Sequence, residues 1–159
     1  MRVYTPIVPA KTDFRKVSQA KASQCACNKV RKAARAITRV YDEALRPSGL
    51  RVTQFGILGI TSALQPVTVT RLADETVTDR TTLTRNLRLL EKLGFIKINE
   101  GKDRRERVVV LTSEGRGALK RAYPMWQQAQ AYVVEELGRD QWEHLSEGLS
   151  AITTLVQEK

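Results

Sequence analysis

The chain has 159 residues, of which 42% are hydrophobic and 28% are charged, and its formal net charge is +10. This length and composition predict one globular domain with a real core. No apolar run approaches the ~20 residues that span a bilayer, and the first residues lack the apolar block of a secretory signal. The sequence therefore predicts a cytoplasmic protein with no membrane partner.

The positive charge is concentrated in two segments. Residues 1–51 carry 12 basic and 3 acidic side chains, and residues 79–111 carry 9 and 5. Such basicity favours a polyanionic partner such as nucleic acid, while a solvated basic face is the alternative interpretation. Charge alone is compatible with both interpretations, and only sequence motifs can distinguish them.

The N-terminal third predicts an arm and two helices. Residues 1–22 contain prolines and polar groups without a period and predict an N-terminal arm. Over residues 23–46 apolar side chains recur at spacings of three and four, which predicts an amphipathic helix that ends before Pro47. A second helix over residues 54–64, capped by Thr53, has little polar surface and is predicted to be buried.

Two short helices follow, with Thr68 and Asp79 as predicted N-caps because their side-chain oxygens can accept from unpaired backbone N–H groups. The second helix is predicted to end at Gly94, which suits the left-handed position after a helix. Its apolar residues share one face: Leu83, Leu87 and Leu90. Its polar residues lie towards the other face: Arg80, Thr81, Thr84, Arg85 and Arg88. One side can pack while the other can touch a polyanion.

A hairpin is predicted after Gly94, where the period changes from 3.6 to about 2. Residues 95–99 and 107–111 are rich in β-formers, and they flank the charged, Gly-containing turn 100–106. The tip of this hairpin carries three basic side chains: Lys102, Arg104 and Arg105.

The C-terminal part predicts two more helices, the first capped by Thr112 and ended by Gly138. The last helix carries a regular apolar stripe: Trp142, Leu145, Leu149, Ile152 and Leu155. The two short helices and the hairpin form too small a unit to cover the stripes on both the first helix and the last two. These helices therefore pack either on each other within one chain or against a second copy.

These segments together resemble the MarR family of bacterial transcriptional regulators. The resemblance rests on Leu72-Ala73, the run 79–85, Leu90-Glu91-x-x-Gly94 and the wing signature Asp103-x-Arg105, and extends over roughly residues 25–159. A departure occurs at Thr76-Val77-Thr78, where the family often has Leu-Gly-Val, because a β-branched residue tolerates positive φ poorly.

The resemblance implies a fold that is mainly α with a small β-hairpin wing (α+β), a winged helix-turn-helix with N- and C-terminal dimerisation helices. Residues 23–159 would form this single MarR-like domain. Within it, residues 52–112 would form the winged helix DNA-binding lobe, and residues 23–46 and 113–159 the dimerisation helices. The implied partners are double-stranded DNA and a second copy of the chain, which as a homodimer would match a pseudo-palindromic operator.

For the helix over residues 80–93, docking in the major groove is expected. Arg85 can form the bidentate pair with guanine that is the commonest specific contact. Arg80 and Arg88 are expected to hold phosphates. Three threonines can offer hydroxyl and methyl groups to base edges: Thr81, Thr82 and Thr84.

For the wing, the resemblance implies that the Asp103 carboxylate orients the guanidinium of Arg105. That guanidinium would enter the minor groove, where narrow A·T-rich DNA concentrates negative potential. Arg104 and Lys102 would flank it on the DNA backbone.

Two kinds of regulation are compatible with these features. The family's effectors tend to bind between dimer helices and DNA-binding lobes, which implies a repressor released by a small molecule, phenolic or otherwise aromatic. The alternative is a thiol-based oxidant sensor. In the peroxide-sensing branch a cysteine of the first helix precedes tyrosines by four and fourteen residues, and this chain has Cys27, Arg31 and Tyr41 at these positions. A nearby guanidinium can lower a thiol pKa, and Cys25 would be a bystander.

Other chemistry finds little support in the sequence. One histidine, His144, and two cysteines cannot supply a zinc site, and there is no Ser-His-Asp set or phosphate loop. We therefore expect no metal, no cofactor and no enzyme activity. An architectural or RNA-binding basic protein is the remaining alternative.

Overall fold

The computed structural model describes residues 24–101, 103 and 105–157. The arm predicted over residues 1–22 lies outside the described residues, as do Lys102 and Arg104 of the predicted wing tip. The chain divides into two compact units, residues 1–37 and residues 38–159.

The first described helix is α2 (Ala26–Leu45), which begins three residues later than predicted. In the described part of the first unit, residues 24–37, every side chain except that of Val30 is exposed. The helix continues into the second unit and is followed by a short 3-10 helix, η2 (Arg46–Ser48), which ends at Gly49 in the left-handed region.

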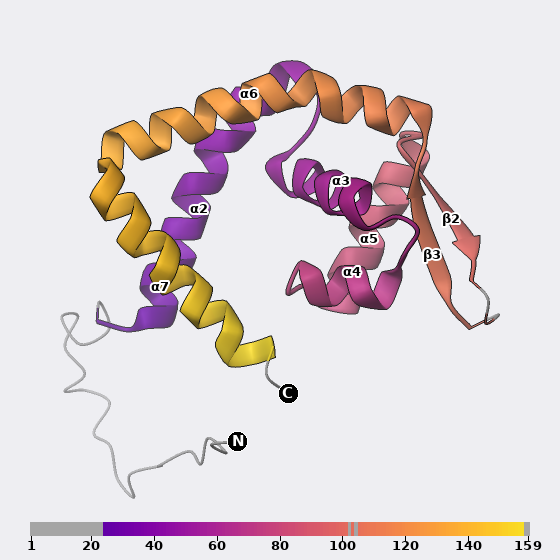
Figure 1. The fold of residues 1–159 in the computed structure, drawn as a ribbon, viewed down its shortest axis with the longest axis horizontal. Helices are drawn as coiled ribbons and strands as arrows, with labels where there is room; N and C mark the ends of the chain where they lie inside the picture. Colours follow the sequence, from indigo (N-terminus) through magenta and orange to yellow (C-terminus); the bar gives the residue numbers. More distant parts are fainter. Residues whose placement is uncertain (1–23, 102, 104, 158–159) are drawn as a thin grey trace, which may run out of the picture. The chain divides into compact units, whose positions relative to one another are not determined.

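The second unit contains the predicted helix-turn-helix, a small sheet and two long helices (Figure 1). Helices α3, α4 and α5 lie together beside the hairpin of β2 and β3 (Figure 1). The elements are α3 (Val52–Leu64), β1 (Val67–Thr68), α4 (Val69–Glu75), α5 (Arg80–Lys92), β2 (Ile96–Glu100), β3 (Arg107–Leu111), α6 (Ser113–Leu137) and α7 (Arg139–Gln157).

Three predicted N-caps are confirmed, because each side chain accepts a hydrogen bond from a backbone N–H of the first turn. Thr68 caps α4, Asp79 caps α5 and Thr112 caps α6, at donor–acceptor distances of 3.1, 2.9 and 3.0 Å. The predicted cap at Thr53 is wrong, since α3 begins at Val52. A distant side chain takes that role: an Asp42 carboxylate oxygen accepts from the Val52 N–H at 2.8 Å.

The predicted hairpin is confirmed, with β2 and β3 antiparallel and Ile98 opposite Val109. A third strand was not predicted: β1 pairs with β3 on its other edge, with Val67 also opposite Val109. The Gln65 side chain extends this edge, because its oxygen accepts the Leu111 N–H at 2.9 Å. The sheet therefore has the strand order β1-β3-β2.

The predicted apolar face of α5 is buried. Leu83, Leu87 and Leu90 are at most 1% exposed and pack with residues of α3, α4, the sheet and α6 in one core. Full burial of such a side chain contributes about 1.5–3 kcal/mol. This packing fixes which face of α5 is turned outward.

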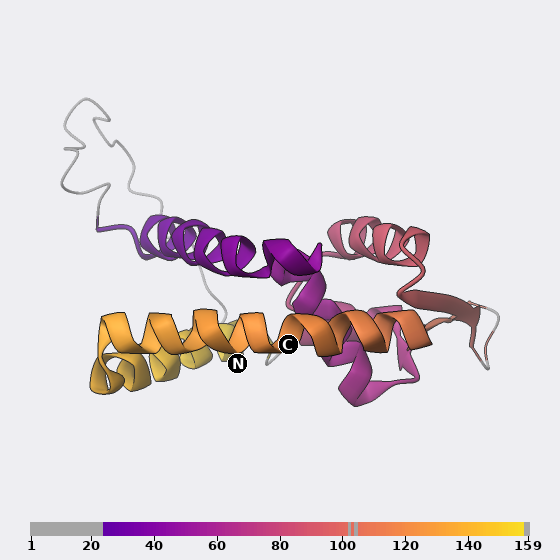
Figure 2. The same cartoon turned by 90° about the horizontal axis from the view of Figure 1, so that it is seen from above.

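A second, smaller core lies between α2 and α6, and α7 carries an exposed apolar stripe. Tyr41, Ala129 and Val133 form that core, and α6 ends at Gly138 with a positive φ of 79°. From there α7 turns back sharply (Figures 1 and 2). Four large apolar side chains of α7 are exposed: Leu145, Leu149, Ile152 and Leu155. Among the described residues, no helix is long and apolar enough to cross a membrane.

The turn between α4 and α5 places a β-branched residue at positive φ. Val77 has a φ of 47° and is the one described non-glycine residue in this region of backbone space. Such a conformation costs on the order of 1–3 kcal/mol and persists only where the surroundings hold it. The turn thus keeps the backbone geometry that favours glycine, although the chain has valine there.

Candidate nucleic-acid interface

An open hollow lies on the outward face of α5. Its volume is about 480 Å³, and five polar side chains line it: Arg80, Thr81, Thr84, Arg85 and Arg88. They come from successive turns of the helix, opposite the buried leucines. The structure thus brings together five of the six residues that the sequence predicted for this helix.

The sixth residue, Thr82, does not line the hollow. It is exposed, its N–H donates to the N-cap Asp79, and its carbonyl accepts from the Asn86 amide at 3.0 Å. Within the hollow, the Thr84 hydroxyl donates to the carbonyl of Arg80 at 2.6 Å, so the hydroxyl oxygen can still accept hydrogen bonds.

No carboxylate that the structure describes forms an ion pair with the guanidinium groups of this face. Among the described residues, the ion pairs join Arg46 to Glu43, Arg51 to Asp42, Arg71 to Glu75 and Arg107 to Glu100. None of them engages the three arginines of the hollow. Three forked donors without a carboxylate partner on one exposed helix face suit phosphate oxygens and guanine edges.

Hydrogen bonds favour the charged form of Asp79, the N-cap of α5. Hydrogen bonds from the side chain and backbone N–H of Thr82 lower the pKa of the Asp79 carboxyl below its usual value. A carboxylate at this end also interacts favourably with the helix dipole. The Asp79 cap therefore stabilises the first turn of α5, which carries Arg80 and Thr81.

At the hairpin tip, Asp103 organises the backbone. One of its carboxylate oxygens accepts from the N–H of Arg105 at 2.9 Å, and its carbonyl accepts from the N–H of Glu106 at the same distance. Both Asp103 and Arg105 are exposed. Orientation of the Arg105 guanidinium by the Asp103 carboxylate stays a prediction, because in this structure the carboxylate engages the backbone.

The hairpin is tied to α5 by two side chains whose roles the sequence did not predict. A Glu91 carboxylate oxygen accepts from the N–H of Ile98 at 3.2 Å, and the Thr112 hydroxyl donates to the carbonyl of Gly94 at 2.6 Å. The signal for Glu91 was its place in the run Leu90-Glu91-x-x-Gly94. Helix and wing are thereby linked at their shared end.

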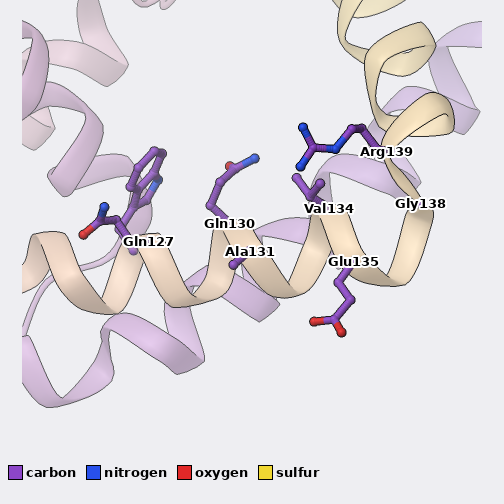
Figure 3. A pocket seen from close by; sticks show the side chains of 8 residues that line it. Gln127, Gln130, Ala131, Val134, Glu135, Gly138 and Arg139 are labelled. Atoms are coloured by element: carbon purple, nitrogen blue, oxygen red, sulfur yellow. The ribbon is translucent and has the colours of Figure 1, made fainter.

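A second hollow, of about 560 Å³, lies along α6 near its C-terminal end and includes Trp126 in its lining. The side chains of Gln130, Val134 and Arg139 rise on one side of the helix, whereas Glu135 points away (Figure 3). The Trp126 ring also stacks on Phe55, with 5.8 Å between the ring centroids. The lining thus combines an aromatic ring, two amides, the Arg139 cation and the Glu135 carboxylate.

The three residues of the predicted thiol site, Cys27, Arg31 and Tyr41, differ in their burial. Cys27 and Arg31 are exposed, one helical turn apart on α2, and Cys25 is also exposed. Tyr41 is buried, and its hydroxyl donates to the side-chain oxygen of Gln130. Burial raises the pKa of the Tyr41 hydroxyl.

Comparison with known proteins matches this geometry to one family. A model of the MarR family matches residues 48–106, from the end of η2 to the hairpin tip. The crystal structure of the transcriptional regulator MosR from M. tuberculosis in complex with DNA is 37% identical, with a TM-score of 0.77. That likeness covers 84% of this chain and 97% of MosR. The chain belongs to the MarR family.

Two further relatives of this MarR-family chain agree. YwoH of Bacillus subtilis (strain 168), an uncharacterized HTH-type transcriptional regulator, is 31% identical over 87 residues. That match covers 55% of this chain and 64% of YwoH, less than two thirds of its length. A mutant MarR from E. coli complexed with operator DNA is 20% identical, with a TM-score of 0.76 over 85% of this chain and 98% of that one, and shares its fold. The family and the winged-helix fold are those of transcriptional regulators rather than enzymes.

Proposed function

We propose that this MarR-family chain is a sequence-specific DNA-binding repressor that binds a pseudo-palindromic operator as a homodimer. The observation that supports this most is the set of arginines and threonines around the hollow on α5, whose arginines form no ion pair with a described carboxylate. MosR, at 37% identity, was crystallised with DNA. The outward face of α5 would enter the major groove, with its N-terminal half against base edges.

Individual roles follow from side-chain chemistry. Arg85 reads a guanine through a bidentate pair, and Thr81 and Thr84 present hydroxyl and methyl groups to neighbouring bases. Arg80 and Arg88 hold phosphates at either end of the hollow. Thr82, in the first turn of α5, would also offer its hydroxyl and methyl groups to base edges. In the wing, Arg105 would enter the minor groove with its guanidinium oriented by Asp103, and Lys102 and Arg104 would contact the DNA backbone on either side.

The homodimer is supported by the uncovered stripe on α7. Leu145, Leu149 and Ile152 are 44%, 40% and 45% exposed, at the spacings that place them on one side of the helix. A contiguous exposed apolar stripe on a soluble protein marks an interaction site. Two-fold symmetry would set two copies of α5 about 34–36 Å apart, which matches successive major grooves on one face of DNA.

Release of DNA by an aromatic small molecule, such as a phenolic compound, completes the proposal. The hollow beside Trp126 offers a ring face for stacking, the amides of Gln127 and Gln130 for hydrogen bonds, and Arg139 for an anionic group. Gln130 also accepts from the buried Tyr41. A ligand that engaged Gln130 would compete with the contact between α2 and α6.

Selection from random duplex DNA by the full-length protein, read by sequencing, tests this function. The expected result is one enriched pseudo-palindrome with half-sites about one helical turn apart. Enrichment of no motif, or equal retention of single-stranded RNA, would instead favour an architectural or RNA-binding basic protein.

A thiol-based oxidant sensor is the second candidate, favoured by the exposure of Cys27 one turn from the exposed Arg31. In this alternative the Cys27 thiolate attacks a hydroperoxide oxygen, which gives a sulfenic acid and releases the alcohol. A stoichiometric hydroperoxide should then release operator DNA, and a thiol reductant should restore binding. Cys27→Ser should abolish the response, and Cys25→Ser, the matched control, should not. Unchanged operator affinity after oxidation of Cys27, verified by mass spectrometry, would exclude this candidate.

A further inference from the structure

Helices α4 and α5 end in the same hydrogen-bonding pattern. At the end of α5, the Gly94 N–H donates to the carbonyl of Glu91 and the Phe95 N–H to that of Leu90, both at 2.9 Å. These are the two bonds of the Schellman motif, in which the residue after the C-cap adopts the left-handed conformation. Gly94 has a φ of 74°, which glycine adopts without steric cost.

The end of α4 makes the same two bonds around a valine. The Val77 N–H donates to the carbonyl of Asp74 at 3.1 Å, and the Thr78 N–H to that of Ala73 at 3.0 Å. Val77 has a φ of 47°, in the region where a branched Cβ is crowded. The chain therefore places glycine at this position in one motif and valine in the other.

Two threonine hydroxyls stabilise the strained turn by hydrogen bonds to backbone carbonyls. The Thr76 hydroxyl donates to the carbonyl of Leu72 at 2.7 Å, and the Thr78 hydroxyl donates to the carbonyl of Thr76 at 3.0 Å. Strained residues persist where surrounding bonds over-determine them, and such positions cluster at functional sites. The conformation at Val77 is held by its neighbours.

The Val77 side chain does not offset this strain by packing. It is 49% exposed and is absent from the described residues that form or pack against the main core. Val77 is close in sequence to the hollow of α5, because only Thr78 and Asp79 separate it from Arg80 and consecutive Cα atoms are 3.80 Å apart. Its Cα therefore lies within about 11 Å of the Cα of Arg80. An exposed apolar side chain thus lies three positions before Arg80, the first residue that lines the hollow of α5.

We propose that Val77 is a specificity-determining residue, whose methyl groups contact a thymine methyl at the edge of each half-site. This inference rests on the proposed DNA-binding function. Apolar contact with the C5-methyl group distinguishes thymine from cytosine in the major groove. Glycine, the residue that the backbone favours, has no side chain with which to make that contact.

The test compares the full-length parent with Val77→Gly on the selected operator. Val77→Gly should raise the melting temperature by roughly 2–4 °C, because strain relief at a β-branched residue exceeds the added chain entropy. It should weaken operator binding by about fourfold per half-site, the effect of removing about one methyl group from a contact. Gly94→Val is the matched control and should lower the melting temperature, since it places valine at the same position of the other motif.

Duplexes in which single thymines are replaced by uracil identify the contact. Replacement of the contacted thymine should weaken the parent by about fourfold per half-site and leave Val77→Gly unaffected. Equal affinity of both proteins for every duplex would overturn the inference, as would a lower melting temperature for Val77→Gly, which would show that the side chain serves the fold. If the parent bound no duplex specifically, the proposed function itself would fail, and Arg85→Ala would then also be without effect.

Discussion

Arg85 and Arg88 lie three residues apart on the same exposed face of α5, yet we expect them to act differently on DNA. Arg85→Ala should cost about 1–3 kcal/mol on the selected operator and relax the base preference at one position per half-site. Arg88→Ala, its matched control, should weaken all duplexes alike and reduce the salt dependence of binding. Fluorescence anisotropy against a panel of single-base variants measures both. Equal discrimination among that panel by the parent and Arg85→Ala would contradict the assignment of base reading to Arg85.

At the same scale, the lowered pKa of Asp79 predicts a specific pH dependence. A carboxyl whose pKa is lower in the folded state contributes stability above its unfolded pKa, about 3.9. That contribution is lost as pH falls through the folded pKa, where both states are protonated. Asp79→Ala should therefore melt below the parent at pH 7, and the difference should shrink below about pH 4.

Asp79→Asn is the control for this dependence, because asparagine also caps helices but does not titrate in this range. Its advantage over Asp79→Ala should stay constant with pH. Melting temperatures of the three proteins between pH 2 and pH 7 decide the matter, and a parent-to-alanine difference that did not change with pH would rule out the charged cap.

At the scale of elements, the join between α6 and the wing depends on a close backbone approach. A Cβ added at Gly115 would lie 1.9 Å from the carbonyl oxygen of Phe95. Gly115→Ala should therefore force α6 away from the backbone of Phe95, just before β2, and lower the free energy of unfolding by about 1–3 kcal/mol. Gly117→Ala on the same helix is the control, since its Cβ would meet the flexible end of Arg121 at 3.3 Å. Urea denaturation that gave both variants the same stability would contradict the close approach.

Periodicity and capping chemistry predicted most of these elements. The leucines of α5 recur at helical spacing and are buried, and Thr68, Asp79 and Thr112 cap the helices that they were expected to cap. Such signals are local, so a single segment of sequence contains them.

Features that depend on distant partners were not predictable in this way. Strand β1 has two residues, too few to show a period, and it exists through its pairing with β3. The first N–H group of α3 is paired by Asp42, ten residues upstream, rather than by Thr53. At the candidate site, the face of α5 was predictable because the leucines define its opposite side. The tie between Glu91 and Ile98 depends on how the hairpin folds back.

At the scale of the whole molecule, the uncovered stripe of α7 predicts assembly. Leu149→Asp places a charge in the proposed dimer interface and should shift the protein to a monomer with weaker binding to the palindrome. Ser150→Asp is the control, because it adds the same charge at an exposed position away from the stripe. Sedimentation equilibrium at micromolar concentration resolves the two species. A parent that sedimented as a monomer under these conditions would disprove the proposed homodimer.

The most direct test of the proposed regulator is the ratio of two dissociation constants of the full-length protein at ~150 mM salt. One is measured on the selected palindrome, and the other on a scrambled duplex of the same length and composition. A sequence-specific regulator should bind the palindrome more tightly by a factor of about 10³ or more. Equal binding of the two duplexes would show that the basic face of α5 recognises charge alone, and would contradict sequence-specific recognition.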